Sequence, residues 1–294
     1  MKKMIPFLLA LLVLSGCGGE RAPAETEVLP DSLSAVPEAI FLPETKVVEP
    51  ISVPAVVTEG KPPAEDYDLA SALRDPWSEE NLYTSGGRLA LLAEAPEGDA
   101  AFYTLPGTEK AGAESVLIQW GDSLAEFGWD FATPRRILPR LACLDLDHDG
   151  NEELIVICYV DSGTGVSIED LHVLEKNDAG TLTDYALLYQ DKKGNPMWEK
   201  LSSLLGLEIA GERAFVILGR ELVEVNKSQL PEEVFGPSAG AIAQFTVIPG
   251  ASFLLFQGSV NVGELRSSCV ADFSAGVTYQ DGVFTLWEFH LYNL

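Results

Sequence analysis

The chain has few basic residues for its length, and histidine is scarce. Its 294 residues contain 19 Lys and Arg against 45 Asp and Glu, with only 3 His. The resulting formal net charge of -26 repels phosphate backbones, so nucleic acid is not expected as a partner. Metal cations and basic surfaces are the partners that such a charge favours.

Cysteine is also scarce, and none of the four cysteines lies in a CxxC pair, which leaves no sign of a zinc or dithiol redox site. The chain lacks the GxxxxGK[ST] and GxGxxG phosphate-binding patterns, and Asp161 to Gly165 is interpreted as a flexible loop. Pro237 to Gly240 is interpreted as a loop rather than a serine nucleophile elbow. His172 and His290 alternate with apolar residues, as on strands. We therefore predict that the protein is not an enzyme.

The N-terminus has the order of features of a bacterial secretion signal. Lys2 and Lys3 precede an apolar run, residues 4–13, that is too short to span a bilayer as a helix. The sequence Leu14-Ser15-Gly16-Cys17 follows, and it resembles the lipobox of bacterial lipoproteins. That resemblance implies a signal peptide over residues 1–16 and a mature chain that begins at a lipidated, palmitate-bearing Cys17.

A proline-rich segment follows the lipobox. Eight prolines lie between residues 18 and 66, and proline at that density interrupts both helices and sheet ladders. We therefore predict that residues 17–66 form a disordered linker between the lipid and the rest of the chain. The stretch Phe41 to Val57 is apolar enough to dock on a folded surface. Residues 67–294 are predicted to form a single domain.

Short apolar runs separated by turn residues dominate that domain. Leu171 to Leu188 and Cys269 to Tyr292 both have the pattern of a hairpin, with turns at Asn177–Gly180 and at Gln280-Asp281-Gly282. Pro196 to Leu205 is the strongest helix candidate, and Tyr67 to Leu73 could form a short one. The predicted fold is mainly β, an α+β fold with few helices. Its antiparallel hairpins would form a sandwich or a partial propeller-like arrangement.

Three aspartates alternate in the sequence LACLDLDHDGNEELIVIC, which runs from Leu141 to Cys158. Counted from Asp145, oxygen-bearing residues fall at positions one, three, five, seven and nine, and a glycine falls at position six. Alternating hard oxygen ligands with a glycine at the sharp turn are what a calcium loop requires. The predicted ligands of one structural calcium ion are Asp145, Asp147, Asp149, the carbonyl of Asn151, and Glu153.

This loop is not an EF-hand, because position twelve is Val156 and the flanking segments have strand patterns rather than helix patterns. It resembles the loops of FG-GAP and VCBS-type repeats, in which calcium is held at the tip of a β-hairpin. The resemblance covers residues 139–160, and Glu153 stands where that family usually has Asp. Only one such loop occurs, so a repeated calcium propeller is not expected.

Cys143 and Cys158 flank the aspartate loop. If residues 139–160 form a hairpin, the two cysteines could be brought close enough for a cross-strand disulfide, or both could be small buried residues without a disulfide. Spacing alone leaves both arrangements open. The third cysteine of the predicted domain, Cys269, would then remain as an odd thiol.

Together these features predict a lipoprotein on the extracytoplasmic face of the cell membrane. Its domain would act as a non-enzymatic binding or interaction module, with a cell-surface protein or a glycan as its ligand. An envelope glycan- or cell-wall-acting hydrolase and an envelope sensory domain are the alternatives. Two facing carboxylates in a cleft would favour the hydrolase.

Overall fold

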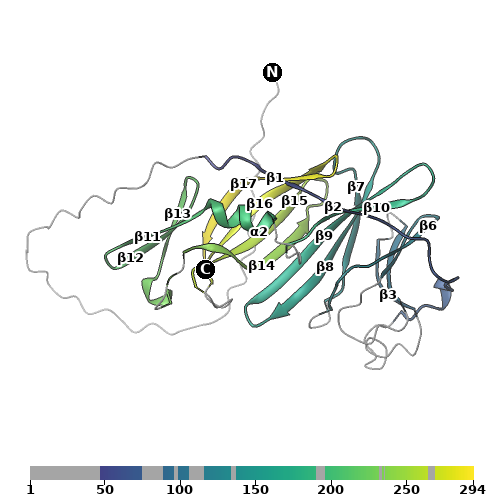
Figure 1. The fold of residues 1–294 in the computed structure, drawn as a ribbon, viewed down its shortest axis with the longest axis horizontal. Coiled ribbons are helices and arrows are strands. Elements are labelled where there is room, and N and C mark those ends of the chain that lie inside the picture. The colour runs from purple at the N-terminus through teal and green to yellow at the C-terminus, as the bar shows by residue number, and fades with distance from the viewer. Residues whose placement is uncertain are drawn as a thin grey trace, which may run out of the picture. The chain divides into compact units, whose positions relative to one another are not determined.

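The computed structural model describes residues 47–74, 89–95, 99–105, 116–133, 137–189, 196–231, 234, 236–263 and 269–294. This part of the chain is mainly β, with mostly antiparallel pairing, which confirms the predicted fold class (Figure 1). Its α-helix, α2 (Pro196–Leu204), lies where the sequence predicts one. None of the described helices is long and apolar enough to cross a membrane. The predicted signal peptide, Cys17 and linker residues 18–46 lie outside the described residues.

The described strands form three sheets. The ten-stranded sheet contains β1 (Ile51–Pro54), β2 (Val56–Glu59), β7 (Arg140–Leu144), β8 (Glu153–Gly163), β9 (Val166–Lys176), β10 (Leu182–Leu187), β14 (Ser238–Val247), β15 (Leu254–Asn261), β16 (Cys269–Gln280) and β17 (Val283–Asn293). The four-stranded sheet contains β3 (Ala90–Ala95), β4 (Ala100–Thr104), β5 (Val116–Trp120) and β6 (Ser123–Phe127). The three-stranded sheet contains β11 (Leu205–Ala210), β12 (Arg213–Leu218) and β13 (Glu221–Val225).

Strand β8 is buried on both faces. Ile155 and Ile157 point into the main hydrophobic core, which α2 and strands β9, β10 and β14 to β17 also line. Their neighbours in β8, including Leu154 and Val156, point into a second core beneath the four-stranded sheet. Because successive side chains of a strand point to opposite faces, a strand with two covered faces is apolar throughout. This accounts for the continuous apolar run that follows the aspartate loop.

Strand β9 is a branch point in the large sheet. One of its edges pairs with β8 along most of the length of both strands. Its other edge is shared, because Ser167 and Ile168 pair in parallel with β14 while residues 171–176 pair with β10. In the strand order β1-β17-β16-β15-β14-β9-β10-β2, strands β14 and β10 therefore follow one another along the same edge of β9, opposite β8.

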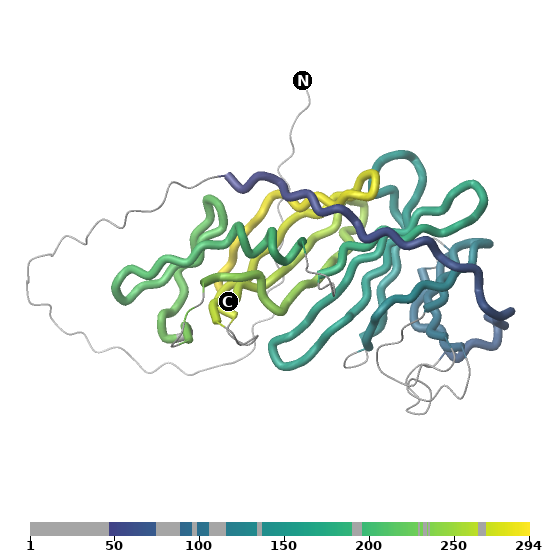
Figure 2. The backbone as a smooth tube through the Cα atoms, viewed as in Figure 1, coloured from purple at the N-terminus to yellow at the C-terminus, as the bar shows by residue number. Residues whose placement is uncertain are grey.

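Residues 51–73 form a segment that we call the N-terminal strap. It pairs with the edge strands of two sheets in turn (Figure 2). Strand β1 pairs with β17, and strand β2, only one residue later, pairs with β10 at the opposite end of the strand order. The strap then bridges from Lys61 to Glu126 of β6, and from Leu73 to Ala90 of β3. The strap therefore connects both ends of the large sheet with both edges of the four-stranded sheet.

The prediction of a disordered linker over residues 17–66 is therefore wrong for residues 51–61. Proline is compatible with an edge strand, since an edge strand needs only half of its backbone groups for pairing. Pro54 ends β1 at such an edge, opposite Val283. Val53 beside it is 2% exposed and packs in the main core, so the segment is held by an apolar contact as well as by backbone bonds.

Two shorter predictions also need correction. Residues 69–71 form a single 3-10 turn, η1 (Leu69–Ser71), instead of the helix predicted over Tyr67 to Leu73. Asp161 to Gly163 continue β8 instead of forming a flexible loop, and Thr164-Gly165 is the turn into β9. Gly165 has a φ of 70°, which is the left-handed conformation that such tight hairpin turns require.

The docked strap predicts a difference between two Val→Thr substitutions only four residues apart. Val53→Thr places a hydroxyl in the main core and should lower the free energy of unfolding by about 2 kcal/mol. Val57→Thr changes a side chain that is 58% exposed and should stay within about 0.5 kcal/mol of the wild type. Chemical denaturation measures both. Equal effects of the two substitutions would contradict a docked strap.

Candidate metal centre

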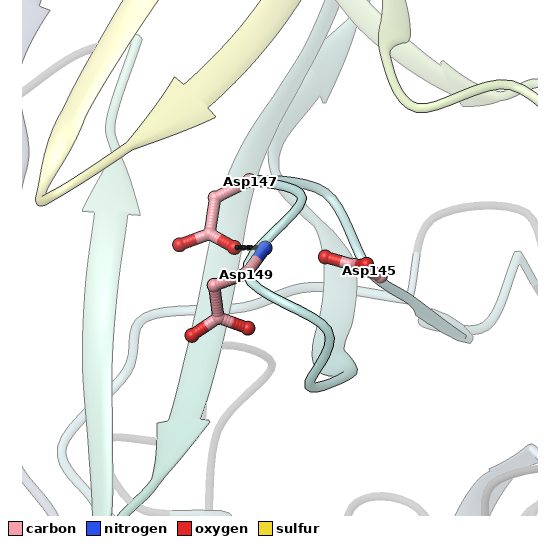
Figure 3. A group of neighbouring side chains, drawn as sticks. All are labelled: Asp145, Asp147 and Asp149. Atoms are coloured by element: carbon pink, nitrogen blue, oxygen red, sulfur yellow. Dashed lines mark hydrogen bonds between the residues drawn. The ribbon is translucent and has the colours of Figure 1, made fainter.

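The aspartate loop connects β7 to β8, and these strands pair up to Leu144 and Glu153 on either side of it. The second residue of the loop, Leu146, is 1% exposed and packs in the main core, so the loop is fastened to the domain near its start. Asp145, Asp147 and Asp149 each offer a carboxylate oxygen, and these three oxygens lie within 4.8 Å of one another. Figure 3 shows Asp147 beside Asp149, with Asp145 facing them across the loop.

Hydrogen bonds between nearby residues give the loop its curvature. The Asp147 Oδ1 atom accepts the Asp149 N–H at 3.0 Å, and the Asp149 Oδ1 atom accepts the Asn151 N–H at 2.7 Å. His148 and Gly150 have φ values of 64° and 94°. Glycine adopts a positive φ without steric cost, which accounts for Gly150 at the sixth position. His148 is exposed to solvent.

The three carboxylates are compensated unevenly within the loop. Hydrogen bonds from the backbone and side chain of Asn151 hold the pKa of Asp149 below its usual value, which favours the charged form. The Asp145 Oδ1 atom is buried and accepts no hydrogen bond among the described residues. A buried carboxylate oxygen without a partner is costly, and a hard cation would satisfy it. The donor set consists of oxygen atoms, which fits calcium or magnesium better than zinc.

The other two predicted ligands differ in position. Asn151 is exposed, and its side-chain amide donates to Asp149 Oδ2 at 3.0 Å. Glu153 is 3% exposed and lies outside the group of three close carboxylates. Burial raises the pKa of Glu153 to about 7. The loop opens onto a depression of about 380 Å³ that is also lined by Glu175, Lys176 and Asp281, among others.

The cysteines that flank the loop cannot form a disulfide. Cys143 is opposite Leu154 in the β7–β8 ladder, and Cys158 lies four residues farther along β8. That separation along a strand is about 13 Å, whereas a disulfide requires Cα atoms less than about 7 Å apart. None of the described cysteines, Cys143, Cys158 and Cys269, is in a disulfide, and Cys158 is buried.

A cleft of about 510 Å³ lies between β7 and β14. It contains one carboxylate, Glu169, whose side chain is 2% exposed and accepts two hydrogen bonds from Arg140, at 2.9 and 2.8 Å. Arg140 and Glu169 also bond to the backbone oxygen and N–H of Phe245. The ion pair therefore joins β7 to β9, and its bonds to Phe245 join both of these strands to β14. It does not supply the two facing carboxylates that glycoside hydrolysis uses.

A second polar group is buried where the four-stranded sheet meets β9 and β10. Asp184 accepts hydrogen bonds from Trp129 Nε1 at 2.8 Å and bonds with His172 Nδ1 at 2.9 Å. The rings of Trp129 and His172 stack with centroids 3.9 Å apart. Burial disfavours a charged His172, but the adjacent Asp184 carboxylate outweighs it and the pKa of His172 is raised. His172 is therefore a hydrogen-bonded core residue on a strand, as its alternation with apolar residues predicts.

Residues Gly236 to Gly240 have the GxSxG pattern, which sequence inspection passed over by interpreting Pro237–Gly240 as a loop. A nucleophile elbow places its serine on a sharp turn between a strand and a helix. Ser238 instead begins β14, is paired opposite Asn261, and is followed by nine further residues of strand. The pattern is therefore not an elbow in this fold.

Comparisons with protein-family models, with characterised proteins and with solved structures find no match to this chain.

Asp170 is a buried carboxylate near His172, and the dependence of stability on pH tests its surroundings. Its pKa is raised to about 6, first by burial, against the hydrogen bond that it accepts from Tyr189 N–H and the nearby His172. A carboxyl with a raised pKa binds its proton more tightly in the folded state, so the stability falls as pH rises from the ordinary value of 3.8 to about 6. Above that pH the cost is about 3 kcal/mol.

Asp170→Asn keeps an oxygen for the Tyr189 N–H and removes the charge. We compare the free energy of unfolding of Asp170→Asn with that of the wild type at the same pH. We expect the gain in stability of the variant to be about 2 to 3 kcal/mol larger at pH 7.5 than at pH 4.5. Urea denaturation at both pH values in chelator measures this difference. If the difference in the free energy of unfolding between variant and wild type is the same at both pH values, Asp170 does not titrate as a buried carboxyl.

Proposed function

We propose that the protein is a lipoprotein anchored through Cys17, whose domain binds one structural calcium ion and acts as a non-enzymatic binding module on the extracytoplasmic face of the membrane. The observation that carries the calcium site is the convergence of the Asp145, Asp147 and Asp149 carboxylates within 4.8 Å at a hairpin tip. The buried Asp145 oxygen without a partner supports it. The resemblance of the loop to FG-GAP and VCBS-type repeats supports the binding role.

A calcium ion in this loop would stabilise the domain by joining the ends of two strands. Both β7 and β8 start or end at the loop, and β8 contributes to both hydrophobic cores. An ion that binds only the folded loop adds its binding free energy to folding. The glycan-acting alternative has less support, because the cleft beside β7 contains a single carboxylate that Arg140 already neutralises.

Calcium should therefore raise the thermal unfolding midpoint. With a dissociation constant of about 10⁻⁴ to 10⁻³ M, typical of extracellular loops, 10 mM calcium contributes about 1.4 to 2.7 kcal/mol. For a domain of this size that is a shift of about 5 °C relative to chelator. Asp145→Asn should abolish the shift.

Asp178→Asn is a matched control, since it removes one carboxylate from the exposed β9–β10 turn and should leave the calcium shift intact. Magnesium at the same ionic strength separates specific binding from screening. Identical midpoints of the wild type in calcium and in chelator would refute the calcium site.

The anchor is tested separately. Cells expressing the wild type and grown with labelled palmitate should give a labelled protein in the membrane fraction, whereas Cys17→Ser should carry no label. Cys269→Ser, which changes a half-buried thiol of the domain, should be labelled as the wild type is. Label that persists in Cys17→Ser would contradict the lipid anchor.

A further inference from the structure

Glu153 differs from the three aspartates of the loop in its surroundings. It is the first residue of β8, is 3% exposed, and is paired opposite Leu144. Its Oε2 atom accepts the backbone N–H of Leu146 at 2.7 Å. The carboxylate of Glu153 therefore faces the backbone of the opposite side of the loop.

This hydrogen bond holds the part of the loop that presents the first aspartates. Leu146 lies between Asp145 and Asp147, so a bond to its amide fixes the backbone between these two residues. The aspartates make no comparable contact with that backbone. The Asp147 and Asp149 carboxylates accept N–H groups only two residues ahead, and Asp145 Oδ1 accepts none among the described residues.

Side-chain length is consistent with a bond across the loop. Glu153 reaches from the start of β8 to the amide of Leu146, and an aspartate at this position would be one methylene shorter. A carboxylate held by a buried N–H donor is also fixed in direction, because such a bond is costly to leave unmade in a buried place. Its oxygens are outside the group of three close carboxylates.

We propose that Glu153 is a positioning residue, which organises the loop for the cation, and that Asp145, Asp147, Asp149 and the Asn151 carbonyl are the protein's ligands. This inference rests on the proposed calcium site and changes one member of the ligand set that the sequence predicts. Calcium takes six to eight oxygen ligands, so water completes its coordination. Groups that orient metal ligands affect affinity by about 10- to 100-fold when they are removed.

The number of metal-bound waters separates a ligand from a positioning residue. Terbium replaces calcium in oxygen sites, and its luminescence lifetimes in H₂O and D₂O count the bound waters. The full-length protein is compared with Glu153→Gln, with Glu153→Asp, and with Glu152→Gln, an exposed neighbour with the same charge change. Val53→Thr serves as a remote destabilised control. Titrations at 20 °C give the terbium affinity, and melts in chelator give the stability without metal.

We expect both Glu153→Gln and Glu153→Asp to keep the wild-type water count. Glu153→Asp is one methylene shorter and loses the bond to Leu146, so it should bind terbium about tenfold more weakly and lower the melting midpoint in chelator by about 5 °C. Glu153→Gln keeps an oxygen for the Leu146 N–H and should stay close to the wild type in affinity and midpoint. Glu152→Gln should match the wild type in all three, and Val53→Thr should keep the wild-type affinity. If Glu153→Gln does not fold, the measurements are made on Glu153→Asp, which retains a carboxylate.

Two results would overturn the inference. One or two additional waters in Glu153→Gln, with an unchanged midpoint in chelator, would make Glu153 a direct ligand. An affinity loss of the same size in Val53→Thr would make the effect of Glu153 one of general stability. If the wild type binds no terbium, the calcium site itself fails and the positioning role fails with it, which the wild-type titration distinguishes from the other outcomes.

Discussion

The domain depends on the burial of β8 and β9 on both faces. A strand that is apolar on both sides requires a cover for each, and the chain supplies two different ones. One face packs against the curved layer of β14 to β17 together with α2 and β12, and the other packs beneath the four-stranded sheet. The aspartate loop stands at the end of this doubly buried strand. Any change in the geometry of the loop is therefore transmitted to both cores.

Sequence patterns predicted those parts of the fold that depend on neighbouring residues. The turns at Asn177–Gly180 and Gln280–Gly282 and the start of α2 at Pro196 come from local turn and helix chemistry, and each lies where it was predicted. The aspartate hairpin is of the same kind, because alternating strand residues and a glycine with positive φ are local properties. The spacing of the three aspartates was therefore sufficient to predict that their carboxylates meet.

Other features depend on residues that are distant in sequence, and no local pattern predicts them. Proline between residues 50 and 63 was interpreted as a sign of disorder, although an edge strand accepts it and β17 supplies the partner. The role of Glu169 depends on Arg140 and on the backbone of Phe245, which come from three separate strands. Glu153 matched a ligand position by counting, whereas its burial and its hydrogen bond from the Leu146 amide are known only from the folded structure.

The strap also determines the order in which the fold can be completed. Ile51 of β1 pairs with Leu286 of β17, so contacts near the beginning of the chain wait for residues near its end. A ribosome makes β1 and β2 first, and β1 then has no partner while more than two hundred residues are added. Loop closure over that distance is slow, so the edge of β17 stays unpaired until β1 docks on it. The first strands to be synthesised are therefore among the last to be paired, and the finished domain carries its earliest segment on its outside.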